Sequence, residues 1–194
     1  MPKTVDPIEK RAEFIAASWN VIAEQGFGAV SMRNVAAAAG CTTGALTHYF
    51  SDRNTLLIEV LRAAHMAAAK RMVAIADASV SDFQRLRAVL LESLPLDDER
   101  LREWRVWLAF WEASMSDQKL AMENQQRYSE WQALVADLLT PLSKNAETDA
   151  EFLIALVDGL GLGIVRCIDG DAGLARQQSK CLHVLDHALN QFRA

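Results

Sequence analysis

Apolar residues recur at three- and four-residue steps along most of the chain, which is the periodicity of an amphipathic helix. The first such segment covers about residues 6–25, with Ile8, Ile15 and Ile22 on one side. Gly26 follows it, and glycine readily takes the left-handed conformation that ends many helices. The pattern therefore predicts a first helix that stops at this glycine.

Two short helices are predicted next from their capping residues. Ser31 can cap a helix over residues 32–39, which Gly40 ends, and Thr42 can cap a third helix over residues 43–49. Serine and threonine side chains are favoured at this position because their oxygen accepts a hydrogen bond from an N–H of the first turn.

The remaining pattern is also helical. Ser51 can cap a fourth helix, about 53–76, with Asp52 in its first turn, where the helix dipole favours an anion. After a break near residues 79–81, further helices are expected over about 82–94, 98–115, 118–140, 148–168 and 172–192. Proline is rare and long β-branched alternations are missing, so the chain is predicted to be all-α, with about nine helices.

The string GCTTGALTHYF, residues 40–50, predicts a DNA-binding motif. Two short helices joined by a glycine-centred turn form a helix-turn-helix, whose second helix enters the major groove. Leu46 and Phe50, four residues apart, would anchor that helix from behind. We expect DNA contacts from the other side chains and backbone groups of the helix, namely Thr42, Thr43, Gly44, Ala45, Thr47, His48 and Tyr49. An ordinary helical hairpin is the alternative.

The segment from Phe14 to Leu57 resembles the DNA-binding domain of the TetR family of bacterial repressors. The resemblance rests on Gly26-Phe27, SMRNVA at residues 31–36, AGCTTGAL at residues 39–46, and HYF at residues 48–50. Thr47 stands where the family usually has an aromatic residue, and Arg53 where it usually has lysine.

The resemblance implies DNA contacts from Ser31, Arg33 and Arg53 as well, the last to a phosphate. It also implies a homodimer on double-stranded operator DNA. The expected organisation is an N-terminal three-helix DNA-binding domain, residues 1–52 with its motif at 31–50. A C-terminal helical bundle, residues 53–194, would bind a small-molecule effector and dimerise.

Charge and cysteine content change this picture little. The net charge is −5, yet residues 1–53 hold five basic and five acidic side chains, so the DNA-binding head is neutral: Lys3, Lys10, Arg11, Arg33 and Arg53 against Asp6, Glu9, Glu13, Glu24 and Asp52. The three cysteines are scattered, and the charged start lacks a signal-peptide core, which favours the cytoplasm. The apolar stretch 152–168 is shorter than the roughly 20 residues that span a bilayer, so no membrane is expected as a partner.

Tryptophans gather in the predicted effector-binding half. Trp104, Trp107 and Trp111 share one face of a helix, and Tyr128 and Trp131 follow on the next. Aromatic faces with nearby carboxylates suit a quaternary ammonium, and the candidate counter-charges are Glu112 and Asp158. The alternative is that this stripe is only hydrophobic core.

A closer resemblance supports the cation. THYF at residues 47–50, WLAFWEASM at 107–115 and LVDGLGLG at 156–163 resemble the choline-sensing repressors of glycine-betaine synthesis within the same family. This implies choline or a related quaternary ammonium as effector. The rival effector is a lipophilic compound, as for regulators of efflux or catabolic genes.

Gly159, Gly161 and Gly163 interrupt an apolar helix, which predicts close approach by another helix or by a ligand. We expect a two-fold four-helix dimer interface with Gly159, Gly163, Leu182 and Leu185. Tight packing inside one chain is the alternative.

Two other classes of function are disfavoured by the sequence. The sequence has no nucleophile–base pair and no phosphate loop, so no enzyme activity, catalytic residue or cofactor is expected. His183 and His187 are interpreted as a surface pair rather than a metal site. A non-specific DNA-compacting protein is disfavoured, because such binding needs many basic contacts and the head is neutral.

Overall fold

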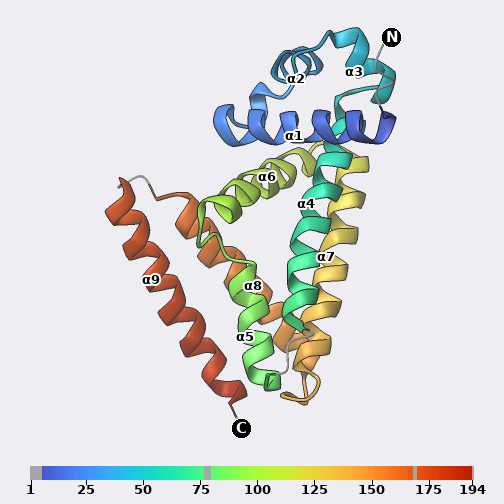
Figure 1. Ribbon diagram of the computed structural model, residues 1–194. Helices are drawn as coiled ribbons and strands as arrows, with labels where there is room; N and C mark the ends of the chain where they lie inside the picture. Colours follow the sequence, from blue (N-terminus) through green and yellow to red (C-terminus); the bar gives the residue numbers. More distant parts are fainter. Residues whose placement is uncertain (1–5, 77–79, 168–169, 194) are drawn as a thin grey trace. The chain divides into compact units, whose positions relative to one another are not determined.

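The computed structural model describes residues 6–76, 80–167 and 170–193. All regular elements within these residues are helical, which confirms the predicted all-α fold (Figure 1). They are α1 (Pro7–Gln25), η1 (Phe27–Ala29), α2 (Met32–Ala38), α3 (Thr43–Tyr49), α4 (Arg53–Ala76), α5 (Asp82–Glu92), α6 (Asp98–Ser114), α7 (Gln118–Leu139), α8 (Ala146–Val165), α9 (Gly170–Leu189) and η2 (Asn190–Phe192).

The predicted helix ends agree closely with those observed, with one difference in capping. α4 is capped by Asp52 and not by Ser51, because the Asp52 Oδ1 atom accepts from the Thr55 N–H at 2.7 Å. The carboxylate accepts more strongly than the serine hydroxyl, and Ser51 donates to Asp52 instead. α8 ends at Val165 and Arg166 caps it, so the predicted extension of this helix to residue 168 is wrong. The predicted break at residue 79 lies outside the described residues.

The chain divides into two compact units. The first comprises Met1–Met66 and Arg105–Asn124, and the second comprises Ala67–Trp104 and Gln125–Ala194. The helices α4, α6 and α7 are therefore each divided between the two units. The functional boundary between residues 52 and 53 stays a prediction.

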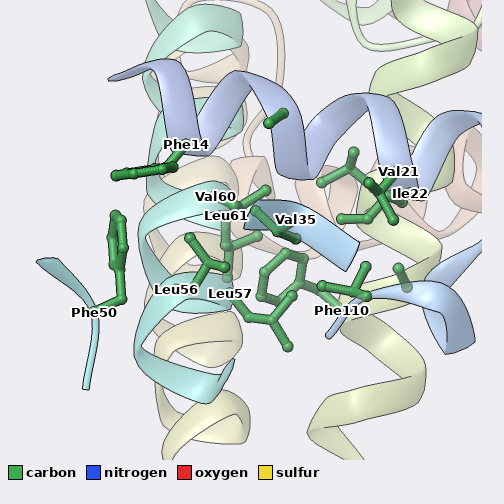
Figure 2. Close-up of a cluster of buried hydrophobic side chains, with 14 of the residues drawn as sticks. Phe14, Val21, Ile22, Val35, Phe50, Leu56, Leu57, Val60, Leu61 and Phe110 are labelled. Atoms are coloured by element: carbon green, nitrogen blue, oxygen red, sulfur yellow. The ribbon is translucent and has the colours of Figure 1, made fainter. Parts of the chain in front are cut away.

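The first unit has its own hydrophobic core, drawn in Figure 2. Each of its largest side chains is at most 2% exposed, and burying one stabilises the fold by roughly 1.5–3 kcal/mol. They come from α1, α2, α4 and α6, and from the end of α3: Phe14, Val21, Ile22, Val35, Leu46, Phe50, Leu56, Leu57, Val60, Leu61 and Phe110. The short helices of the motif are thus fixed on α1 and on the first turns of α4.

The second unit is a separate helical cluster. Its core is formed by α5, α7, α8 and α9, and α8 packs along α9. The buried carboxylate of Glu103 in this unit receives two hydrogen bonds from Arg71 at 2.9 and 2.7 Å. Burial still raises the pKa of Glu103, because removal from water outweighs the arginine. No helix of the described residues has the length and apolar character that crossing a membrane requires.

Candidate functional site

The helix-turn-helix forms by the local rules that its sequence indicates. Gly26 and Gly40 take positive φ angles of 79° and 65°, which only glycine adopts without strain. The Ser31 hydroxyl accepts from the Asn34 N–H at 3.1 Å and caps α2. Thr42 caps α3 by accepting from the Ala45 N–H at 3.2 Å. The predicted start and stop signals of both helices are therefore confirmed.

α3 has two different sides. Leu46 within the helix and Phe50 at its end have no exposed surface, as predicted for the residues that anchor it. On the opposite side Thr43, Thr47 and His48 are exposed. Gly44 is also exposed, whereas Ala45 and Tyr49 are half-buried at the margin. The outward side of α3 therefore carries small and polar residues that are accessible.

Three of the predicted DNA contacts also have structural roles. Ser31 and Thr42 serve as the helix caps described above. Arg53 is half-buried, and its Nε donates to the Val30 carbonyl at 2.7 Å. Burial lowers the pKa of Arg53. Arg53 thus holds the start of α4 against the segment before α2, whereas Arg33 lies exposed on α2. The phosphate contact of Arg53 stays a prediction.

The predicted effector residues fall into both units. In the first unit, Trp107 is half-buried against the core, and Trp111 is also half-buried. Glu112 is exposed and lines an open cavity of about 360 Å³. The other residues lining this cavity come from the end of α1 and from α6: Ile22, Ala23, Gly26, Arg105, Leu108 and Ala109.

In the second unit, Trp104 is buried, as expected if the aromatic stripe is hydrophobic core. It is 6% exposed, and its Nε1 donates to the Ser93 carbonyl at 2.8 Å. Its ring lies directly on the backbone of α8, since a Cβ added to Gly161 would come within 2.1 Å of ring carbons. The close approach predicted for the α8 glycines is thus made at Gly161 by this tryptophan.

Tyr128 and Asp158 are brought together in the second unit. The Tyr128 hydroxyl donates to the Asp158 carboxylate, which joins α7 to α8. Burial raises the pKa of Asp158, although the hydrogen bond from Tyr128 opposes the shift. Burial and this carboxylate also raise the pKa of Tyr128. Trp131, one turn after Tyr128, packs half-buried against the core of the same unit. An aromatic ring therefore lies beside a carboxylate whose charged form is disfavoured by burial.

The four residues predicted at a dimer interface have unequal surroundings. Gly159 is exposed and has open space where a Cβ would be, and Leu182 is half-buried. A Cβ at Gly163 would approach Gln177 of α9 in the same chain at 2.9 Å. Leu185 has no exposed surface, so its side chain belongs to the core of its own chain.

Other apolar side chains of α8 and α9 remain exposed. Phe152 is 49% exposed and Leu162 is 36% exposed on α8, and Val184 is 44% exposed on α9. Sequence reasoning missed these three residues, although Phe152 and Leu162 fall at a helical spacing from Gly159. In the described part of the chain, no three metal-binding side chains are grouped.

Two protein-family models match the chain. Residues 14–60 match the model of bacterial regulatory proteins of the TetR family. Residues 83–190, more than half of the chain, match the model of the C-terminal part of BetI-type transcriptional repressors. The resemblance to the TetR family is confirmed, and the C-terminal part is of the BetI type.

Two relatives of similar sequence are transcriptional regulators. The regulator PksA of Bacillus subtilis is 36% identical over 169 residues, which cover 84% of this chain and 82% of PksA. The regulator BetI of Burkholderia thailandensis is 36% identical over 172 residues, which cover 84% of this chain and 85% of BetI.

Solved structures of similar fold span nearly the whole chain. A transcriptional regulator from Rhodococcus sp. Rha1 has a TM-score of 0.84 at 28% identity, covering 94% of this chain and 95% of its own. A regulator from Saccharomonospora viridis, solved in complex with choline, has a TM-score of 0.82 at 24% identity. That match covers 93% of this chain and 97% of the other.

Proposed function

This chain belongs to the TetR family of bacterial transcriptional regulators, and from that premise we propose that it is a homodimeric repressor released from its operator by a small organic cation such as choline. Its relatives are regulators and not enzymes. We place it in the cytoplasm, in contact with DNA. The regulatory role is that of the family.

DNA binding is carried by the two-sided character of α3. A helix of seven residues is too short to be stable alone, so its orientation is set by Leu46 and Phe50 in the core. Its exposed side then offers Thr43 to phosphates, and Thr47 and His48 to base edges. In a dimer, two such helices would read inverted half-sites about one turn of DNA apart or a little more.

The dimer would form through the exposed apolar side of α8 and α9. Phe152 and Leu162 flank Gly159 at helical spacing on α8, Val184 is exposed on α9, and Gly159 leaves room for close helix approach. The half-buried Leu182 would lie at the margin of this interface. Apolar groups of this size are stabilised when a partner removes them from water.

A cationic effector is supported by the pair Tyr128 and Asp158. The carboxylate is costly while buried without a full counter-charge, and an ammonium group beside it would relieve this cost. The Tyr128 and Trp131 rings provide faces that attract cations. The choline complex of the Saccharomonospora viridis regulator supports the same ligand class. The carboxylate of Glu112 is kept as a second candidate counter-charge.

Release requires that the effector bind the DNA-free conformation more tightly than the DNA-bound one. The ratio of the two affinities sets the fold-change in operator affinity, and linkage makes the effect reciprocal.

The DNA-binding part is tested by selecting binding sequences from a random duplex pool with the purified protein. We expect the selected sequences to converge on one inverted repeat. Equal recovery of all sequences would contradict the proposal and would favour non-specific binding.

The effector part is tested by thermal melting with choline, glycine betaine and bulky hydrophobic cations. A ligand that binds only the native state raises the melting temperature, by RT ln(1 + [L]/Kd) in free energy. We expect choline to stabilise the protein and Asp158→Asn to weaken that response. Stabilisation by neutral lipophilic compounds alone would identify the efflux or catabolic type of regulator instead.

A further inference from the structure

We propose that Arg11 is a positioning residue for operator recognition, because it ties the C-terminal end of α3 to α1 and α4 within the first unit. This inference rests on the proposed DNA-binding function of α3. Arg11 lies on α1, and the DNA-contact residues expected from the sequence do not include it.

The Arg11 side chain makes three contacts at the end of α3. Its Nη1 donates to the backbone carbonyl of Tyr49, the last residue of the helix, at 3.0 Å. Its guanidinium carbon lies 4.7 Å from the centroid of the Phe50 ring. Its Nη2 lies 3.5 Å from the Glu59 carboxylate on α4. One side chain therefore joins α1, α3 and α4.

The chemistry of these contacts explains why an arginine stands here. The last carbonyls of a helix have no partner within it, and they carry the negative end of the helix dipole. A guanidinium satisfies such a carbonyl, stacks on an aromatic face and keeps a further N–H edge for a carboxylate. A lysine ammonium is a point charge and cannot make all three contacts in this geometry.

The network continues beyond Arg11. Glu59 also accepts from Arg62 Nη1 at 3.3 Å, and Arg62 donates two hydrogen bonds to Glu123 at 3.0 and 2.8 Å. Glu123 lies on α7 in the same unit. The end of α3 is thus connected through side chains to α4 and to the start of α7.

Aromatic packing on the same side of α3 adds to this restraint. The Phe14 ring, one turn after Arg11 on α1, lies 5.5 Å from the Tyr49 ring and 6.2 Å from the Phe50 ring. His48, predicted to face DNA, meets the Tyr49 ring edge-on at 5.4 Å. Arg11 and Phe14 thus restrain the end of α3 together, and loss of Arg11 would remove one of these two restraints on the helix that carries Thr47 and His48.

The test compares Arg11→Gln with Lys10→Gln on the operator selected from the random pool. Both variants remove one positive charge from the same turn of α1, but Lys10 forms its ion pair with Glu13 of its own helix, whereas Arg11 donates to the Tyr49 carbonyl of α3. We expect Arg11→Gln to weaken operator binding by about tenfold more than Lys10→Gln does, the size expected for losing a charge-assisted hydrogen bond. The slope of log affinity against log salt should be equal in the two variants, because neither loses a phosphate contact.

Hydrogen exchange provides a readout that needs no DNA. The amides of α3 should exchange faster in Arg11→Gln than in wild type, and at the wild-type rate in Lys10→Gln. Arg11→Lys, which keeps the charge, should fall between wild type and Arg11→Gln in affinity and exchange. It replaces Arg11→Gln if that variant fails to fold.

Equal affinity losses in the Arg11 and Lys10 variants, or unchanged exchange in α3, would overturn the role of Arg11. Failure of the wild-type protein to select any operator would instead overturn the proposed function. In that case the exchange experiment still decides whether Arg11 positions α3.

Discussion

Gly161 carries a packing requirement that its two neighbouring glycines do not share. A Cβ at Gly161 would lie 2.1 Å from carbons of the Trp104 ring, whereas nothing lies within 4 Å of a Cβ at Gly159. At Gly163 the nearest atom is the end of the flexible Gln177 side chain. The sequence indicates that the three glycines are unusual in a helix, but it cannot assign a neighbour to each one.

Gly161→Ala is therefore expected to destabilise the protein. Overpacking against a rigid indole costs roughly 1–3 kcal/mol, and the higher helix propensity of alanine returns about 1 kcal/mol of it. Chemical denaturation measures the difference. As a control, the same substitution in a Trp104→Leu background should be neutral or stabilising, because the ring that it meets is gone. An equal loss in both backgrounds would show that Trp104 is not the cause.

Asp158 should give the protein a distinct dependence of stability on pH. Burial raises its pKa above the ordinary value of 3.8, so the folded state binds more protons than the unfolded state between these two values. The stabilisation that Asp158 contributes is then fully present at low pH and is lost as the pH rises through its folded-state pKa.

The contribution of Asp158 is measured by comparing wild type with Asp158→Asn in denaturation at several pH values. The stability of the variant relative to wild type should increase as the pH is raised from acid to neutral. The comparison removes the opposite contributions of Asp52, Asp97 and Asp186, whose pKa values are lowered. A constant difference across pH would contradict the assignment.

At the scale of helices, most of the secondary structure could be predicted from local signals. Thr42 fixes the start of α3 by capping it, Gly40 with its positive φ follows the end of α2, and both signals act within a few residues. The side that each helix buries was harder to predict. The sequence predicts Leu185 at a dimer interface, and the structure buries its side chain in the core of its own chain. The phosphate contact of Arg53 stays a prediction, but its hydrogen bond to Val30 could not be predicted, because that partner lies 23 residues away in sequence.

The exposed side of α8 leads to a prediction about assembly. Gly159→Leu places a large side chain where its own chain leaves open space, so the folded monomer should tolerate it. If α8 meets its two-fold copy at Gly159, the added side chain separates the helices and weakens the dimer. We expect sedimentation to shift toward the monomer while the helical circular dichroism signal is retained. An unchanged dimer would place the interface elsewhere.

At the scale of the whole chain, the family could be predicted from a short stretch, whereas the effector residues could not be located. The motif near residues 31–50 is defined by spacing and residue type, which one sequence displays. The aromatic stripe of α6 has helical periodicity whether its rings are core or pocket. The structure assigns Trp104 to core packing, and the pairing of Tyr128 with Asp158 becomes visible only once α7 and α8 lie together.

The central claim is that the outward side of α3 lies against DNA, and Thr43→Glu tests it most directly. Glutamate in the first turn of α3 is compatible with the helix dipole, so the fold should be retained. Thr148→Glu is the matched control, since Thr148 is also exposed in the first turn of a helix, α8.

The measurement is the affinity of wild type and both variants for the selected operator, with melting temperatures recorded alongside. We expect a loss on the order of a hundredfold or more for Thr43→Glu, because a carboxylate would face phosphates at close range. Thr148→Glu should keep wild-type affinity. Operator binding that survives in a folded Thr43→Glu protein would contradict the account.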